Sequence, residues 1–274
     1  MGKFDGVLFF TDYDDTLYNS RHTVSPENRA AIRYFIDNGG YFSIATGRAH
    51  RTFTPQIEKE RLTLNAPVVL SNGAAIYDYA AGRYLVNSCL DGAAPQWLAQ
   101  LCAEFPGLGF EAYHGEDIYV HNPNAVTREH LAKVGGTQIL SPILEMPTPW
   151  SKAILQQDEP YLKEVQARLL ALYGDRCEAI FSNRHLLELT AKGCDKGAMA
   201  GKVAGLLHIA PGNLYCMGDN QNDIPMLALS AVPFAPANCS QPVRDWMDAR
   251  GARILGHCDG HAVAQAIGIL DGIY

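Results

Sequence analysis

The sequence lacks the features that mark membrane-spanning, nucleic-acid-binding and zinc proteins. No apolar stretch approaches the roughly 18 residues that a membrane-spanning helix needs. Lys and Arg number 22 against 29 Asp and Glu, and the formal charge of −7 argues against a nucleic-acid footprint, which requires a basic patch. The 9 His and 7 Cys form neither a His-Glu-x-x-His nor a Cys-x-x-Cys pattern. We therefore expect no membrane or nucleic-acid partner, and no zinc.

The chain also lacks a paired-cysteine framework and a recognisable leader. An odd and scattered set of cysteines predicts reduced thiols rather than disulfides. They are Cys89, Cys102, Cys177, Cys194, Cys216, Cys239 and Cys258. The first residues have no apolar signal-peptide region, and Gly6 stands where a myristoylation signal needs Ser or Thr. We expect a cytoplasmic protein.

The first part of the chain alternates strand and helix patterns. With 274 residues, 47% hydrophobic and 19% charged, the chain can bury one large core or two smaller ones. Ser25 and Pro26 suit the N-cap and first position of a helix over 27–37. A strand over 41–45 and a helix over about 48–59 follow. This alternation predicts an α/β fold with a doubly wound parallel sheet.

The middle of the chain has a different pattern. A hairpin is expected over 75–86, and helices and adjacent strands from about Leu90 onward predict an α+β module with an open sheet. The expected helices are 94–104, 124–133 and 159–172, and the expected strands are 108–113, 117–121, 152–156, 177–181 and 186–190. Pro142, Pro147 and Pro149 predict irregular chain. We predict a core domain of residues 1–88 and 191–274, interrupted by an inserted domain of residues 89–190.

Three aspartates follow the first predicted strand. The apolar run from Val7 to Phe10 ends at Asp12, Asp14 and Asp15. The carboxyl ends of strands are where ligands bind in open α/β sheets. Two like charges ~4 Å apart repel by roughly 4 kcal/mol at an effective dielectric near 20. A hard divalent cation with oxygen ligands would offset this repulsion, whereas a solvated acidic turn is the alternative for such a motif alone.

Polar residues recur at the other predicted strand ends. Asp219 and Asp223 follow the apolar run 214–217, and Thr46-Gly47-Arg48 and Ser71-Asn72-Gly73 follow two further strands. Asp195-Lys196-Gly197 opens the helical pattern over 198–207. Because strand exits meet at one edge of a sheet, one crevice can collect them. The expected set is Asp12, Asp14, Thr46, Asn72, Lys196, Asp219 and Asp223.

In these motifs the sequence resembles the haloacid dehalogenase (HAD) superfamily, and within it the Cof-type hydrolases. Asp12-Tyr13-Asp14-x-Thr16-Leu17 resembles the first family motif, and the other three appear in family order. These are Ala45-Thr46-Gly47-Arg48, Asp195-Lys196-Gly197 and Gly218-Asp219-x-x-Asn222-Asp223, with Asn72-Gly73-Ala74 matching a further Cof-type segment. Asp15 departs from the family Gly, although Asp tolerates unusual backbone angles. Asn238 matches a C-terminal family motif only in part.

The resemblance implies a substrate-selecting cap between the second and third motifs, and a role for each motif residue. Asp12 would be the nucleophile that forms an aspartyl phosphate, and Asp14 the general acid–base. Thr46 would bind a phosphoryl oxygen and Lys196 would neutralise charge in the transition state. The implied Mg²⁺ site uses Asp12, the main-chain carbonyl of Asp14, and Asp219, with Asp223 supporting these ligands more than binding the ion itself.

Further residues are expected near the substrate. The substrate-binding set is Gly47, Arg48, Asn72, Gly73 and Asn222. Several of them have a plainer alternative: the two Asn residues can close turns, the two Gly residues can permit tight turns, and Arg48 can be a surface helix residue. In the cap, residues that could line the cleft, or only pack, are Tyr113, His114, Tyr119, His121, Trp150 and Lys152.

The resemblance implies a magnesium-dependent phosphatase acting on small phosphorylated metabolites, with sugar phosphates first among them. Related members also act on pyridoxal phosphate, flavin mononucleotide and pyrimidine precursors. A phosphomutase with the same aspartyl chemistry is an alternative, and so is a non-catalytic phospho-aspartate switch protein. For the assembly we expect a monomer or a weak homodimer.

Overall fold

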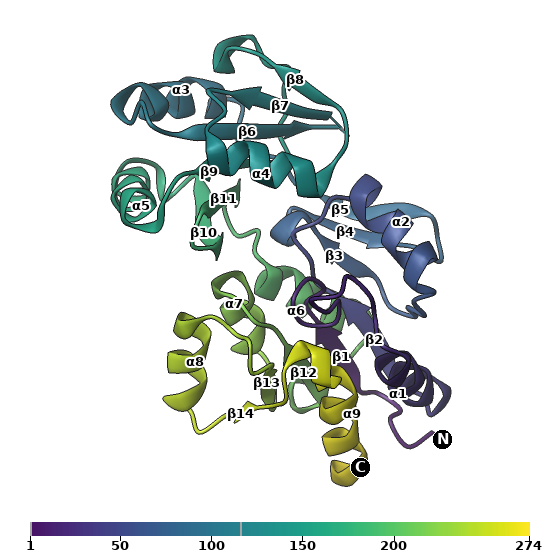
Figure 1. The fold of residues 1–274 in the computed structure, drawn as a ribbon. Coiled ribbons are helices and arrows are strands. Elements are labelled where there is room, and N and C mark those ends of the chain that lie inside the picture. The colour runs from purple at the N-terminus through teal and green to yellow at the C-terminus, as the bar shows by residue number, and fades with distance from the viewer. Residues whose placement is uncertain (1, 116) are drawn as a thin grey trace.

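The computed structural model describes residues 2–115 and 117–274, and it places a parallel sheet at the centre of the part that holds both termini (Figure 1). The strand order is β14-β13-β12-β1-β2, and all pairs are parallel. The strands are β1 (Leu8–Thr11), β2 (Tyr41–Ile44), β12 (Leu214–Met217), β13 (Pro233–Ala235) and β14 (Arg253–Ile254). In β1 the side chain of Phe9 packs into one hydrophobic cluster, whereas Leu8 and Phe10 pack into another, because successive side chains point to opposite faces.

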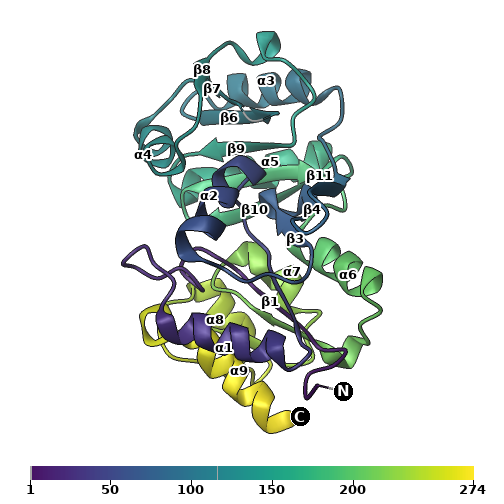
Figure 2. The same cartoon turned by 90° about the vertical axis from the view of Figure 1, so that its right-hand side faces the viewer.

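Helices cover both faces of this core sheet (Figure 2). On the Phe9 face lie α1 (Pro26–Asp37) and α9 (Ala262–Ile273), which pack against each other. On the other face lie α6 (Lys196–Leu206), α7 (Ile224–Leu227) and α8 (Gln241–Asp248). Ser25 caps α1 and Pro26 is its first residue, as predicted. The predicted doubly wound α/β core is confirmed.

A small antiparallel sheet adjoins β2. It contains β3 (Val68–Leu70), β4 (Ala75–Asp78) and β5 (Arg83–Asn87), in that order. The predicted hairpin is therefore present as β4 and β5. One parallel bridge from Ala45 to Val69 joins β3 to the end of β2, next to α2 (His50–Glu60). This bridge brings the Thr46–Arg48 and Ser71–Gly73 turns together.

The cap contains a second, six-stranded sheet with the order β10-β11-β9-β6-β7-β8. Its strands are β6 (Gly109–His114), β7 (Asp117–His121), β8 (Gln138–Leu140), β9 (Lys152–Gln156), β10 (Cys177–Asn183) and β11 (Leu186–Ala191). On one face α3 (Ala94–Glu104) and α5 (Glu159–Tyr173) bury a core that includes Trp150. Helix α4 (Ala125–Val134) packs on part of the opposite face, and the rest of that face points toward the core domain.

The separate cap sheet confirms the predicted α+β insertion, while the boundaries at residues 89 and 190 stay a prediction. Strand β8 was not predicted: the proline-rich region around it was expected to be irregular, yet Gln138–Leu140 pairs in parallel with β7. Five short 3₁₀ segments complete the fold among the described residues. They are Ser71–Gly73, Ile143–Glu145, Pro211–Asn213, Gln221–Asp223 and Cys258–Gly260.

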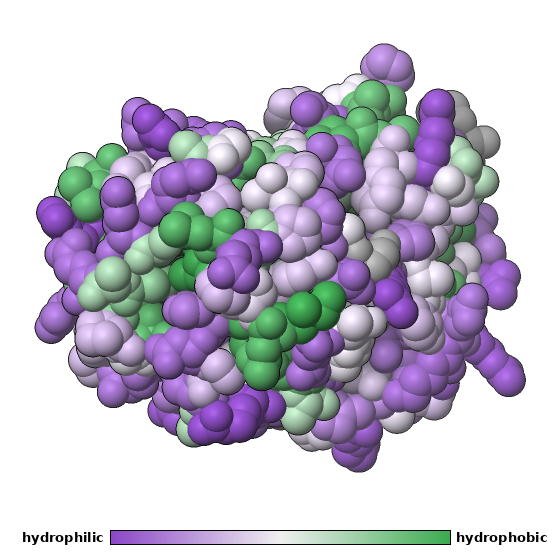
Figure 3. All heavy atoms as spheres, turned by 90° about the horizontal axis from the view of Figure 1, so that it is seen from above, coloured by the Kyte–Doolittle hydropathy of each residue, from purple (hydrophilic) through white to green (hydrophobic). Residues whose placement is uncertain are grey.

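The surface is mostly polar. Seen from above, over the cap, it carries green apolar patches among purple hydrophilic groups (Figure 3). Leu140 and Leu144, with 74% and 65% of their surface exposed, are the most exposed of the large hydrophobic side chains described in the cap. Within residues 2–115 and 117–274, no helix combines the length and apolar character needed to cross a bilayer.

Candidate active site

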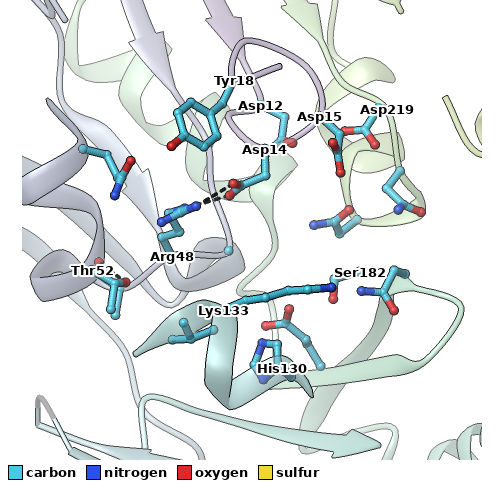
Figure 4. A pocket seen from close by; sticks show the side chains of 18 of the residues that line it. Asp12, Asp14, Asp15, Tyr18, Arg48, Thr52, His130, Lys133, Ser182 and Asp219 are labelled. Atoms are coloured by element: carbon cyan, nitrogen blue, oxygen red, sulfur yellow. Dashed lines mark hydrogen bonds and ion pairs between the residues drawn. The ribbon is translucent and has the colours of Figure 1, made fainter. Parts of the chain in front are cut away.

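A cavity of about 600 Å³ lies between the carboxyl ends of the core strands and the cap sheet. Figure 4 shows the carboxylates of Asp12, Asp15 and Asp219 on one side of it, with His130 and Lys133 of the cap on the other. The core-domain lining comprises Asp12, Asp14, Asp15, Tyr18, Asn19, His22, Gly47, Arg48, Ala49, Thr52, Gln56, Asp219, Asn220 and Asn222. The cap lining comprises Tyr113, His130, Lys133, Val134, Lys152, Ser182, Asn183 and Glu188. Enclosure by two domains suits a small substrate.

Three buried carboxylates meet where β1 and β12 end. Thr11 pairs with Met217 in register, so Asp12 and Asp219 leave neighbouring strands at the same edge. Asp12, Asp219 and Asp223 each offer one oxygen, and these oxygens lie within 4.8 Å of one another. Thr16 donates a hydrogen bond to Asp219 Oδ1 at 2.9 Å. Asp223 Oδ2 accepts the backbone N–H groups of Asp219 and Asn220.

Lys196 balances part of this negative charge. It is the first residue of α6, whose N-cap Asp195 accepts the backbone N–H of Ala198. Its Nζ lies 2.6 Å from Asp12 Oδ1 and 2.6 Å from Asp223 Oδ1, and the side chain is 1% exposed. Burial alone would lower the pKa of the Lys196 ammonium, but the two carboxylates raise it, so the ammonium stays charged.

The carboxylates nevertheless remain in excess. Burial raises the pKa of Asp12 to about 7, although Lys196 opposes this shift, and Asp223 adds to it. Burial also raises the pKa of Asp219 well above its usual range, with the charges of Asp12 and Asp223 acting in the same direction. A cation placed among these oxygens would offset the repulsion. An all-oxygen set of carboxylates suits a hard ion such as Mg²⁺.

Asp14 and Asp15 lie on the turn that follows. The guanidinium of Arg48 makes two hydrogen bonds to Asp14, 2.8 Å from Nε to Oδ2 and 2.7 Å from Nη2 to Oδ1 (Figure 4). Asp15 adopts a φ of +59°, which confirms that Asp can hold the turn where the family has Gly. Asn238 secures this turn, because its Nδ2 donates to the Asp15 carbonyl at 2.7 Å and its Oδ1 accepts the N–H of Cys258.

The second-motif turn and the Asn72 turn share hydrogen bonds. Buried Thr46 accepts the N–H of Arg48 on its hydroxyl at 3.1 Å and the N–H of Asn72 on its carbonyl at 3.0 Å. Asn222 Nδ2 donates to Asn72 Oδ1 at 3.0 Å. The remaining amide atoms, Asn72 Nδ2 and Asn222 Oδ1, are buried and have no hydrogen-bond partner among the described residues. Unsatisfied buried amides beside carboxylates fit a site completed by a polar ligand.

Gly73 lies against the backbone of Asp195, at the start of the third motif. It lies outside the cavity lining, and a Cβ at this position would lie 2.4 Å from the carbonyl carbon and oxygen of Asp195. With a φ of +100°, the residue serves the close approach of two chain segments. The plainer alternative of a tight turn fits these observations, and substrate binding at Gly73 stays a prediction.

Only part of the expected cap residues reach the cavity. Tyr113 and Lys152 line it, whereas Trp150 is buried in the cap core and donates a hydrogen bond to the Pro147 carbonyl. The described lining does not include His114, Tyr119 or His121.

Sequence reasoning missed five polar residues of the cap wall: His130, Lys133, Ser182, Asn183 and Glu188. One signal was available. Polar residues alternate with apolar ones along the cap strands, as in Glu111-Ala112-Tyr113 and Leu187-Glu188-Leu189-Thr190. Residues that pair directly across antiparallel strands share a face, so this alternation marks one polar sheet face.

Taken together, the fold and the site define a hydrolase with a carboxylate-rich centre beneath a cap. A family model described as haloacid dehalogenase-like hydrolase matches residues 9–267. The chain belongs to this family, in its Cof-type branch, and is a phosphoric monoester hydrolase.

Similar proteins agree with this membership. The pyridoxal phosphate phosphatase YbhA of Escherichia coli is 24% identical, covering 93% of this chain and 95% of its own. The 5-amino-6-(5-phospho-D-ribitylamino)uracil phosphatase YwtE of Bacillus subtilis is 23% identical, covering 85% and 88%. Among solved structures, a haloacid dehalogenase-like hydrolase from Bacteroides thetaiotaomicron has a TM-score of 0.80 at 21% identity, covering 98% and 100%. A HAD subclass IIB sugar phosphatase has a TM-score of 0.81 at 19% identity, also covering 98% and 100%.

Proposed function

We propose that this protein is a magnesium-dependent phosphatase that hydrolyses small phosphorylated metabolites through an aspartyl phosphate on Asp12. The observation that carries the proposal is the meeting of Asp12 and Asp219, which line the capped cavity, with the buried Lys196, which contacts Asp12. Lys196 holds Oδ1 of Asp12. Among the described residues no hydrogen bond or ion pair to Asp12 Oδ2 is present, so Oδ2 is the oxygen that we propose attacks phosphorus.

The proposed reaction has two steps. Asp12 Oδ2 forms a bond to phosphorus while the bond to the leaving oxygen breaks, and Asp14 gives that oxygen a proton. Asp14 then takes a proton from the water that attacks phosphorus, the bond from Asp12 Oδ2 to phosphorus breaks, and the Asp12 carboxylate is regenerated as inorganic phosphate is released. Because Arg48 holds both oxygens of Asp14 in the structure, Asp14 must exchange one of these contacts for the leaving oxygen.

The proposed metal ligands are Asp12, the main-chain carbonyl of Asp14, and Asp219. Asp223 belongs to the same cluster, but Lys196 and two backbone N–H groups already use both of its oxygens. It would therefore orient the site more than bind the ion. Bound magnesium would offset the charge that gathers on the phosphoryl oxygens.

Thr46, Asn72 and Asn222 are proposed to bind the phosphoryl group together with the peptide of Gly47. Support comes from the unsatisfied Asn72 Nδ2, which is a buried donor beside the Gly47 turn: a Cβ on Gly47 would lie 3.1 Å from it. Arg48 is proposed to orient Asp14.

Sugar phosphates are the first substrate class to test, because the cap wall carries both hydrogen-bond donors and acceptors that suit a hydroxylated leaving group. Pyridoxal phosphate and phosphorylated pyrimidines belong to the same screen, since relatives are named for such substrates. We propose a cytoplasmic enzyme, as a monomer or weak homodimer.

The test is phosphate release from a panel of sugar phosphates, pyridoxal phosphate and p-nitrophenyl phosphate, with MgCl₂ and with EDTA. Asp12→Asn should lower kcat by roughly 10³-fold or more, because a nucleophile is removed. Asp37→Asn, at the exposed end of α1, is the matched control and should leave kcat unchanged. Circular dichroism checks that both variants keep the fold.

Three results would overturn the proposal. Full activity of Asp12→Asn would remove Asp12 as the nucleophile. Isomerisation of a sugar phosphate without phosphate release would indicate a phosphomutase. A phosphoenzyme that persists without turnover would indicate a phospho-aspartate switch.

A further inference from the structure

A buried lysine of the cap contacts the backbone of the proposed phosphate-binding turn. Lys152 is the first residue of β9, and its side chain is 5% exposed. Its Nζ lies 3.0 Å from the carbonyl oxygen of Gly47, which is 105 positions away in the chain. It also lies 2.8 Å from Glu188 Oε2 and 4.6 Å from the centre of the Tyr113 ring. The ammonium thus joins the cap sheet to the core domain.

The register of the cap sheet explains how these partners meet. Lys152 pairs directly with Tyr113 on β6, and Glu188 on β11 pairs with Ile154. Glu188 is therefore the diagonal neighbour of Lys152 on the same sheet face, within reach of a long side chain. This face points toward the core domain, because all three polar side chains line the cavity.

Two of the three donors of the Lys152 ammonium are used within the protein. The Gly47 carbonyl and the Glu188 carboxylate accept them, and the Tyr113 ring lies within cation–π distance of Nζ. An ammonium engaged in this way has at most one donor left for a leaving group. The geometry therefore favours positioning of the protein over direct binding of substrate.

Gly47 connects to the catalytic groups on both sides. Its neighbour Thr46 accepts the N–H groups of Arg48 and Asn72. Arg48 in turn holds both oxygens of Asp14. A displacement of the Gly47 peptide would therefore move the proposed phosphate ligands and the proposed general acid at once.

We propose that Lys152 is a positioning residue that aligns the Thr46–Arg48 turn for phosphoryl transfer when the cap lies against the core. The cap then takes part in catalysis through a backbone contact that is the same for every substrate. This inference rests on the proposed function for its kinetic readout, but not for its structural one.

The kinetic test compares Lys152→Met/Glu188→Gln with Glu188→Gln alone. The double variant avoids a buried, unpaired Glu188 carboxylate, which would destabilise the fold of a single Lys152 variant. Relative to Glu188→Gln, kcat should fall by about 10-fold to 100-fold, as for other supporting residues. The fall should be equal for p-nitrophenyl phosphate and for sugar phosphates, and KM should change little. Lys163→Met, an exposed lysine of the cap helix α5, is the control and should keep wild-type kinetics.

The structural test is hydrogen exchange of two backbone amides in this turn. The N–H of Arg48 donates to the Thr46 hydroxyl, and the N–H of Ser71 donates to the Arg48 carbonyl. Exchange should become about 10-fold faster in the double variant than in Glu188→Gln, since the turn loses a restraint. Faster exchange with no phosphatase activity in any variant would reject the proposed function but keep the positioning contact. Unchanged kcat together with unchanged exchange would overturn the inference. A loss confined to KM, or to substrates with large leaving groups, would also overturn it and make Lys152 a substrate contact.

Discussion

Replacing Lys196 with Met should destabilise the core domain as well as abolish activity. The substitution removes the ammonium that lies 2.6 Å from both Asp12 and Asp223, and it leaves two buried carboxylates next to a third, Asp219. Methionine fills most of the space of the lysine side chain, so the loss of charge dominates over the loss of packing.

The magnitude follows from the geometry. At 2.6 Å and an effective dielectric near 20, each contact contributes about 6 kcal/mol of attraction before desolvation is counted. Desolvation of the buried ions cancels much of this, and breaking a buried pair costs about 3–5 kcal/mol in practice. At roughly 2–4 °C per kcal/mol for a domain of this size, Tm should fall by roughly 6–20 °C.

The assay is thermal unfolding in EDTA, so that no divalent cation offsets the carboxylates. Lys202→Met, an exposed lysine of the same helix, is the matched control and should melt within about 2 °C of wild type. Adding Asp223→Asn to Lys196→Met should recover part of the lost Tm without restoring activity, because it removes one unpaired charge. The assigned charge balance is wrong if Lys196→Met has the same Tm as the wild type. It is also wrong if the double variant has a lower Tm than Lys196→Met alone.

Two further predictions concern the proposed metal site and its turn. Burial raises the pKa of Asp12 to about 7, against the opposing effect of Lys196. Between pH ~4 and ~7 the folded protein therefore holds a proton on Asp12 that the unfolded chain has lost. The free energy of unfolding of the metal-free protein should fall as pH rises through this window. Since Mg²⁺ needs the ionised carboxylates, the rise in Tm with MgCl₂ over KCl of equal ionic strength should grow from about pH 5.5 to about pH 8, and a larger rise at the acid end would contradict the assignment. Asp15→Gly should keep kcat within about 3-fold, since the turn at φ +59° suits Gly and one negative charge beside Asp14 is lost; a fall of orders of magnitude in phosphate release would give Asp15 a catalytic role.

The sequence predicted the site residues best where a charged or polar residue directly follows a predicted strand. Asp12 and Asp219 each follow an apolar run, and parallel pairing of β1 with β12 must bring such residues to one edge. Lys196 was predicted at a helix start from the motif, and the structure adds why a cation is stable there: two carboxylates outweigh the unfavourable helix dipole. Its exact partners, including Asp223, depend on packing between distant segments and have no local signal.

The cap wall could be predicted less well, because a polar residue in a strand looks the same whether it faces solvent or a cavity. His130 comes from α4, and its Nδ1 lies 3.0 Å from Oε1 of the fully buried Glu111, a contact that no spacing in the sequence indicates. Strand β8 was missed for a related reason: it has three residues, and its pairing with β7 is set by the tertiary structure and not by its own pattern.

The placement of Lys152 shows how an inserted domain can affect chemistry that its own residues do not perform. Every predicted catalytic side chain lies in the core domain, so a cap that only selected substrates would need no contact with the Thr46–Arg48 turn. The hydrogen bond from Lys152 to the Gly47 carbonyl is such a contact, and it is made within the turn that carries Arg48, which binds Asp14. Because burying a lysine requires compensating partners, a site that served only to fill space would hold an apolar residue instead. The buried Lys152 ammonium is thus best explained by its contact with the Thr46–Arg48 turn of the core domain, which it holds in place.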